Sequence, residues 1–423
     1  MVERAGGRGW ARRVRLVALW RVGRRLGDER LFAVSQPVGD GGPVVVVQGP
    51  VGQLDAHVGC PAVEPEVAIP EAALWRGSDV ACIDDFAVDL YPAACATLEE
   101  AAVHQVANGL HPVDVEPGYL PLGDLEPTIE AARHEALKGT GMVLLRGFPV
   151  DRLSDDEMAM FFWGIGLRLG RAVSQSVMGE RLGHVIDVTD VDPHARAYRN
   201  RSELTPHCDP ADLLSFLCLA AAAEGGESRF VSSLTVHEEI RATRPDLLEH
   251  LYRGFHYHRF GEHEEGTEPV TPWRVPVYSV CDGLLSCRYV KEYVEIAADE
   301  DPNVEITAVE REALELFEAT TQRPDLRVAF TLQPGEAIIA NNFMVLHART
   351  AFTSHPDRRR ELLRLWMAAQ PPRPVVREIA LYDRAYHGGE VGVPPQPGRV
   401  PSFASRFDQG WRQPCHSRNR QER

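Results

Sequence analysis

The chain has 423 residues, of which 44% are hydrophobic and 25% charged, and its formal net charge is −16 at pH 7. This composition is typical of a globular protein and excludes disorder as a description of the whole chain. The acidic balance argues against a nucleic-acid partner, which needs a basic face for the phosphates. No apolar run approaches the ~18 residues that span a bilayer, so we expect no membrane segment.

The two ends of the chain differ in composition from its middle. Residues 1–67 are first Arg-rich and then dominated by Gly, Pro and Val, without the cleavage site of a secretory signal. We therefore expect a poorly ordered extension over 1–67, one folded body over 68–390 and a Pro- and Arg-rich tail over 391–423. The eight cysteines form no Cys-x-x-Cys pair and predict reduced, buried thiols in a cytoplasmic protein.

Apolar patterning and turn residues predict the elements of the body. In chain order these are a buried strand at 141–148, a helix at 154–169 that opens with a capping box, a strand at 213–222 before a Gly-Gly turn, a short helix at 235–241 and another at 310–320. A strand pair at 327–332 and 336–340 is predicted around the Pro-Gly turn at 334–335. A helix followed by many short strands predicts a mainly β fold, a sandwich or barrel with surrounding helices.

The chemistry centres on a His-x-Asp motif. His207 and Asp209 are one residue apart, so on an extended strand both side chains point to the same face. An imidazole and a carboxylate presented together are two ligands of the 2-His-1-carboxylate triad that binds non-haem iron(II) and leaves positions open. The motif alone is weak, because a surface His and Asp can share this spacing by chance.

A third ligand and a buried cation follow later in the chain. His347 comes after the strands around the Pro-Gly turn, and Arg364 follows seventeen residues further on, among apolar neighbours. An unpaired guanidinium is costly to bury, whereas its planar fork can hold a carboxylate with two hydrogen bonds. A salt bridge to a core acid is the alternative role for Arg364.

At this point the chain resembles the TauD/TfdA-type iron(II)/2-oxoglutarate-dependent dioxygenases. The resemblance rests on HCD at 207–209, AEGGESRFVSS at 223–233, PGEAIIANNFMVLHARTAF at 334–352 and RRRELLRLW at 358–366, in that order. It implies a double-stranded β-helix (jelly-roll) core and the use of iron(II), 2-oxoglutarate and O2. It also implies hydroxylation of a small molecule with release of succinate and CO2.

Carried over by position, the resemblance implies a role for each matching residue. His207, Asp209 and His347 would bind iron, and Arg364 would pair with the distal carboxylate of 2-oxoglutarate. Ser228 would bond the same carboxylate through its hydroxyl. Arg360 occupies a position where some members have a second arginine near the co-substrate, although a solvated basic turn is an equal alternative.

Other residues carry weaker expectations. Tyr198 and Arg201 precede the first iron ligand and could line the substrate pocket, or they could be exposed loop residues. We expect Asn342 to brace the strands, Cys208 to pack on the face opposite the ligands, and the His-rich segment 254–263 to be a solvated loop rather than a separate metal site. His237 is expected to pack.

Two other function classes stay open at this stage. A zinc hydrolase could use the same ligands, although no His-Glu-x-x-His motif supplies a general base. A non-catalytic jelly-roll protein could bind metal or ligand alone. The acidic surface favours a cationic or zwitterionic substrate, such as an amino-acid-derived or specialised metabolite, free or carried on a protein. The oligomeric state is not predicted.

Overall fold

The computed structural model describes residues 67, 69–80, 82–189, 199–263, 266–382 and 392–396. The predicted extension over 1–67 therefore lies almost entirely outside the described residues, and so does most of the predicted tail. Residues 392–396 of that tail pack on the body, where Val393 is buried and its N–H donates to Ser174 O. In the described part of the chain, no helix is long and apolar enough to cross a membrane.

Two sheets form the core of the described residues. The larger one has seven strands: β1 (Ala87–Asp89), β2 (Met142–Arg146), β12 (Glu336–Asn341), β6 (Leu213–Ala220), β15 (Glu361–Ala368) and β3 (Arg171–Ala172) in this order, with β4 (Leu182–Ile186) also paired to β15. The smaller one has the order β11 (Arg327–Phe330), β8 (Ser228–Ser232), β13 (Val345–Arg349) and β5 (Leu204–His207). All but one of the pairings in these sheets are antiparallel, the exception being β1 with β2. This is the predicted jelly-roll core.

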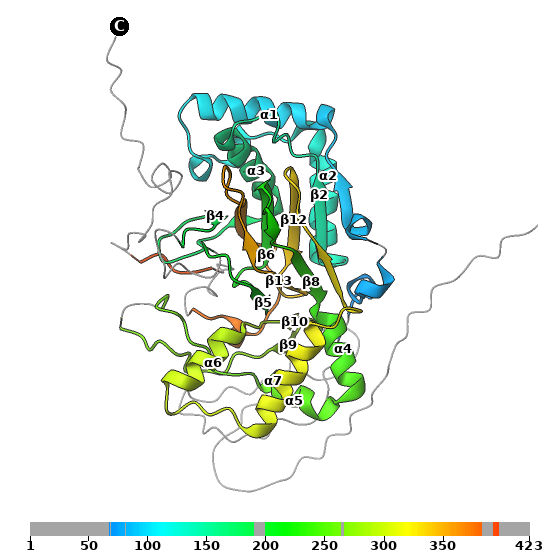
Figure 1. The fold of residues 1–423 in the computed structure, drawn as a ribbon, viewed down its shortest axis with the longest axis vertical. Helices are drawn as coiled ribbons and strands as arrows, with labels where there is room; N and C mark the ends of the chain where they lie inside the picture. The colour runs from blue at the N-terminus through cyan, green and yellow to red at the C-terminus, as the bar shows by residue number, and fades with distance from the viewer. Residues whose placement is uncertain are drawn as a thin grey trace, which may run out of the picture. The chain divides into compact units, whose positions relative to one another are not determined.

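Helices surround the two sheets on different sides (Figure 1). The first group is α1 (Pro92–Ala107), α2 (Glu126–Lys138) and α3 (Asp155–Leu169), and α2 and α3 pack on the larger sheet. The second group is α4 (Ser233–Thr243), α5 (Pro245–Arg253), α6 (Lys291–Glu300) and α7 (Ala308–Thr321). Two short strand pairs complete the fold: β9 (Tyr278–Cys281) with β10 (Leu284–Cys287), and β7 (Glu224–Gly225) with β14 (Phe352–Thr353). Short 3-10 turns lie at Glu71–Ala73, Gly77–Asp79, Ile83–Phe86, Pro112–Asp114, Pro117–Tyr119, Gly123–Leu125 and Arg377–Ile379.

The larger sheet separates two hydrophobic cores because its strands are apolar on both faces. On β15, Leu363 and Leu365 belong to the core that contains α1–α3, whereas Leu362 and Trp366 belong to the core between the sheets. The same alternation appears on β12, where Ile339 faces the helices. Side chains of successive strand residues point to opposite faces, so one strand serves both cores.

Most predicted elements are confirmed. The helix predicted at 154–169 is α3, where Ser154 Oγ accepts from Glu157 N and Glu157 Oε2 accepts from Ser154 N. The strands predicted at 141–148 and 213–222 are β2 and β6, and the two short helices lie within α4 and α7.

One pairing differs from expectation. Pro334-Gly335 does join β11 to β12, with Gly335 at a positive φ of 86°, but the two strands do not form a pair. β11 pairs with β8 in the smaller sheet, while β12 lies between β2 and β6 in the larger one. The turn therefore carries the chain from one sheet to the other, which local turn chemistry alone does not reveal.

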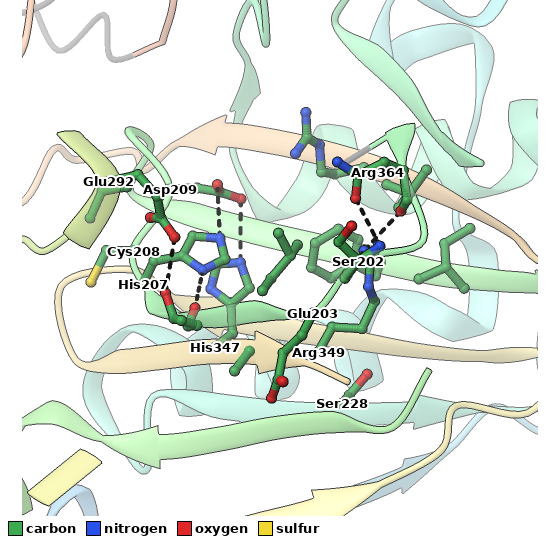
Figure 2. A pocket seen from close by; sticks show the side chains of 18 of the residues that line it. Ser202, Glu203, His207, Cys208, Asp209, Ser228, Glu292, His347, Arg349 and Arg364 are labelled. Atoms are coloured by element: carbon green, nitrogen blue, oxygen red, sulfur yellow. Dashed lines mark hydrogen bonds and ion pairs between the residues drawn. The ribbon is translucent and has the colours of Figure 1, made fainter. Parts of the chain in front are cut away.

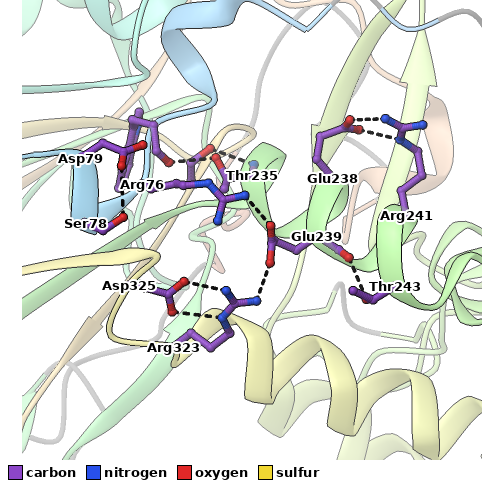
Figure 3. A network of polar contacts seen from close by, with 12 residues as sticks. Arg76, Ser78, Asp79, Thr235, Glu238, Glu239, Arg241, Thr243, Arg323 and Asp325 are labelled. Carbon is purple, nitrogen blue, oxygen red and sulfur yellow. Dashed lines mark hydrogen bonds and ion pairs between the residues drawn. The ribbon is translucent and has the colours of Figure 1, made fainter.

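A network of ion pairs fastens the N-terminal edge of the body to the helices (Figure 3). Arg76 and Arg323 each donate to a different carboxylate oxygen of Glu239 on α4, and Arg323 also pairs with Asp325 at 2.5 Å. The hydrogen bond from Arg76 is the main cause of a lowered pKa at Glu239. Three segments distant in sequence thus meet at one carboxylate.

Candidate active site

The smaller sheet brings the three predicted ligands together. His207 at the end of β5 and His347 on β13 are Cα partners across an antiparallel pair, and their rings lie 4.2 Å apart between centroids. Asp209 follows directly after β5. One ligand atom from each of these residues lies within 4.8 Å of the others, as Figure 2 shows from close by. Among the described residues, this is the one cluster of histidine, cysteine and acidic side chains able to hold a metal ion.

The two imidazoles each present Nε2 to the carboxylate of Asp209. His207 Nδ1 lies 2.7 Å from Thr205 O, so it donates there and leaves Nε2 to face Asp209 Oδ1 at 3.9 Å. His347 Nε2 lies 3.6 Å from Asp209 Oδ2. Burial, with a smaller contribution from His207, lowers the pKa of His347 to about 3. A neutral imidazole keeps the lone pair that a metal ion needs.

Hydrogen bonds and neighbouring charges fix the position and the charge of Asp209. Burial alone would raise the pKa of its carboxyl, but His347, Arg364 and other neighbours outweigh burial and the pKa is lowered. Trp366 Nε1 donates to Asp209 Oδ2 at 2.8 Å, and Asp209 N donates to Asn342 Oδ1 at 3.1 Å. Asn342 therefore braces the ligand loop, in line with its predicted role. A carboxylate with fixed orientation is a preorganised metal ligand.

The donor set fits a 2-His-1-carboxylate iron site. His347 Nδ1 is buried and has no hydrogen-bond partner among the described residues, so the ring is oriented by packing alone, near the rings of Phe216 and Phe230. In Figure 2 the Cys208 sulfur points away from the two imidazoles, and the residue is fully buried, as expected.

A cavity of about 340 Å³ opens beside the triad. Ser228, Arg360 and Arg364, the three residues predicted to bind the co-substrate, all line it. Arg201 is exposed and does not line it, although its neighbours Asn200, Ser202 and Glu203 do. Tyr198 lies outside the described residues.

The cavity has two chemically different sides. In Figure 2, Arg349, Arg364 and Ser228 lie on one side of the imidazoles and Glu292 lies on the other. Near Glu292 the lining includes the aromatic side chains of Phe260 and Tyr293, whose rings are 4.8 Å apart between centroids. Sequence reasoning missed Arg349, Glu292 and this aromatic pair.

Two other predictions concern histidines outside the triad. His237 is buried and its Nε2 lies 2.8 Å from the Tyr252 hydroxyl, so it packs as expected. The His-rich segment is not the predicted solvated loop, because Phe255, Tyr257, Arg259 and Glu262 within it are buried. His256 Nδ1 bonds Thr271 O and His258 pairs with Glu300, and within the described residues these histidines join no metal cluster.

Comparison with known proteins agrees with this geometry. The family model described as "Taurine catabolism dioxygenase TauD, TfdA family" matches residues 108–366, more than half of the chain. FR-33289 synthase of Streptomyces rubellomurinus is 27% identical over 71% of this chain and 90% of its own length. A taurine hydroxylase-like protein of Stachybotrys chartarum is 27% identical over 79% of this chain and 87% of its own.

Solved structures share the fold at low sequence identity. An asparagine oxygenase in complex with Fe(II), hydroxyasparagine and succinate has a TM-score of 0.54 at 18% identity, covering 67% of this chain and 93% of that one. The non-haem iron oxygenase OrfP in complex with Fe and α-ketoglutaric acid has a TM-score of 0.51 at 14% identity, covering 66% and 93%. With the family model matched and the predicted ligands gathered in one cavity, this chain belongs to the TauD, TfdA family and is an iron(II)- and 2-oxoglutarate-dependent dioxygenase.

Proposed function

We propose that this enzyme hydroxylates an unactivated carbon of a small molecule, with iron(II) bound by His207, Asp209 and His347. The observation that supports this most directly is the convergence of the three ligand atoms within 4.8 Å at the wall of a cavity that is also lined by arginines. Bound iron would supply the oxidation chemistry with O2 and 2-oxoglutarate, which leaves as succinate and CO2. Asp209 occupies a metal position, so oxygen transfer is favoured over halogenation.

The chain's own part in the reaction is to bind and orient. Thr205 O fixes the His207 ring through Nδ1, and the Trp366 indole fixes one oxygen of Asp209, so two ligands keep their orientation without metal. The apolar lining of the cavity, which includes Phe216, Phe230 and Leu362, excludes water from the reacting carbon.

Two arginines could take the distal carboxylate of 2-oxoglutarate. Arg364 Nε already donates to Gln175 Oε1 at 2.6 Å, and its guanidinium lies 4.5 Å from the Trp366 ring centre and close enough to Asp209 to lower that residue's pKa. Arg360 has a buried Nη1 without a partner in the described part of the chain. We therefore assign the distal carboxylate to Arg360, together with Ser228, and keep the Arg364 assignment expected from the sequence as the alternative.

The other side of the cavity suits a cationic group. Glu292 lines it together with Phe260 and Tyr293, and a substrate ammonium could contact both the carboxylate and the aromatic faces. The structural neighbours hold hydroxyasparagine and hydroxyarginine. We propose an amino-acid-derived zwitterion, free or carried on a protein, as the substrate.

The test measures succinate formed from 2-oxoglutarate under iron(II) and ascorbate with a panel of free amino acids and their amides. An amino-acid-dependent increase in succinate supports the proposal, whereas hydrolysis of any panel member under zinc(II) would favour a hydrolase. Anaerobic iron(II) with 2-oxoglutarate should give a visible charge-transfer band in the wild type and in the His256→Gln control. The band should be lost in His347→Gln, and its absence from folded wild type would favour a binding protein.

A further inference from the structure

Two buried arginines that line the cavity meet at one aromatic ring, that of Phe352. The guanidinium carbons of Arg349 and Arg360 lie 4.9 and 4.8 Å from the centre of the Phe352 ring. Arg349 is 6% exposed and Arg360 is 4% exposed, and both line the same cavity as the triad. Ser228 on β8 is the Cα partner of Arg349 on β13. A hydroxyl-bearing residue and two cations therefore share one end of the cavity.

Within the described residues, neither arginine of this pair forms an ion pair with an acidic side chain, and Arg349 Nε and Arg360 Nη1 are buried donors without partners. Arginine side chains keep their positive charge in proteins, so two like charges lie close to each other here. Burying two positive charges side by side is energetically costly, and an anion bound between them would offset this cost.

Arg349 also contacts the segment that leads to the first iron ligand. Its Nη2 donates to Asn200 O at 2.9 Å and to Ser202 O at 2.7 Å. The adjoining backbone adds a third contact, because Phe352 N donates to Arg201 O at 3.1 Å. Residues 200–202 run directly into β5, which ends at His207.

We infer that Arg349 is a second guanidinium of the co-substrate site, which binds the distal carboxylate of 2-oxoglutarate jointly with Arg360 and thereby positions the segment 200–202. The inference rests on the proposed function. A carboxylate between two arginines satisfies the unpartnered donors of both side chains and removes their mutual repulsion. Arg349 acts at once on the co-substrate and on the chain that carries His207.

The experiment compares two 2-oxo acids by calorimetry on the iron(II)-loaded enzyme without oxygen. 2-Oxoglutarate has the distal carboxylate, whereas 2-oxobutyrate has the same metal-binding end without it. In Arg349→Gln we expect the Kd of 2-oxoglutarate to rise about tenfold or more, with little change for 2-oxobutyrate. Arg349→Lys should be intermediate because it keeps the charge and loses the fork. Arg359→Gln is the matched control, from the same run of arginines and outside the cavity lining, and should bind both acids as the wild type does.

A second readout follows the segment itself. Amide hydrogen exchange of residues 200–203 should slow when 2-oxoglutarate binds the wild type, and this protection should be lost in Arg349→Gln. Wild-type affinity for 2-oxoglutarate in Arg349→Gln overturns the inference, and so does an equal loss for both acids, because that loss would act through the metal. If Arg349→Gln does not fold, Arg349→Lys decides on the same criterion. If the wild type binds neither acid, the proposed function fails first.

Discussion

The indole of Trp366 offers a direct test of how the iron site is preorganised. Its Nε1 donates to Asp209 Oδ2 at 2.8 Å, and both side chains are buried. Trp366→Phe keeps an aromatic ring beside Arg364 and removes this donor. The carboxylate then loses the contact that fixes its orientation before iron arrives.

The magnitude follows from a hydrogen bond to a buried charge. Such bonds contribute about 1.5–3 kcal/mol to stability, against about 0.5–1.5 kcal/mol between neutral groups. Loss of a group that orients a metal ligand typically lowers metal affinity about 10- to 100-fold. We expect the metal-free Trp366→Phe protein to unfold at lower urea and to bind iron(II) at least tenfold more weakly in anaerobic calorimetry.

Trp163→Phe is the control for this prediction. Trp163 is also buried, and its Nε1 donates to a neutral acceptor, Val115 O, at 3.1 Å in the other core. The Trp163→Phe protein should be less stable because its ring is smaller and the hydrogen bond to Val115 O is lost, but its affinity for iron should be unchanged. Equal iron affinity in Trp366→Phe and the wild type, or equal weakening in both variants, would refute the reasoning.

Three further predictions concern stability. Glu239→Gln removes the carboxylate that Arg76 and Arg323 share, and it should lower the free energy of unfolding by about 1 kcal/mol in urea at low salt and by less at 1 M salt. Glu249→Gln is the control, because it breaks only an exposed helical ion pair and should leave the free energy of unfolding almost unchanged. Burial raises the pKa of Asp212 from 3.8 to about 6, so the folded protein holds this proton more tightly and stability falls by about 2–3 kcal/mol as pH rises from 4 to 6. Asp212→Asn should flatten that part of the pH profile, and an unchanged slope would contradict the assignment. Gly254→Ala should destabilise the fold by about 1–3 kcal/mol in urea unfolding, since Gly254 has φ of 73° and a Cβ would meet Val275 O at 2.1 Å.

The His207–Asp209 part of the triad could be predicted because its geometry is local. One residue between His207 and Asp209 places both on the same side of an extended segment, and the structure has that segment as β5 and the residues after it. The meeting with His347 is not local, since β13 and β5 are far apart in sequence. The resemblance to a family supplied that long-range step, and periodicity could not have done so.

Sequence reasoning missed that β11 and β12 join different sheets, and it missed the role we infer for Arg349, for a related cause. A Pro-Gly turn specifies that the chain reverses, and it does not specify which sheet each strand joins. Arg349 follows His347 by two residues, so the same alternation that placed Asp209 could have indicated that Arg349 shares a face with His347. The signal was present in the sequence, but a lone arginine on a strand is ambiguous until the partners around it are known.

One face of β15 lines the cavity and fixes the order in which polar and apolar side chains follow one another there. Arg360, just before the strand, and Leu362, Arg364 and Trp366 on it all line the cavity, while Leu363 and the other alternate residues pack under the helices. The alternation spaces the two arginines four residues apart with an apolar side chain between them. Trp366 then reaches Asp209, the proposed iron ligand, and Arg364 lies next to it. Arg360 lies at the end of this series of residues, and Arg349 and Ser228 of the smaller sheet line the cavity with it. A ligand with two acidic ends would therefore lie along β15, with its metal-binding end beside Trp366 and its distal end at Arg360.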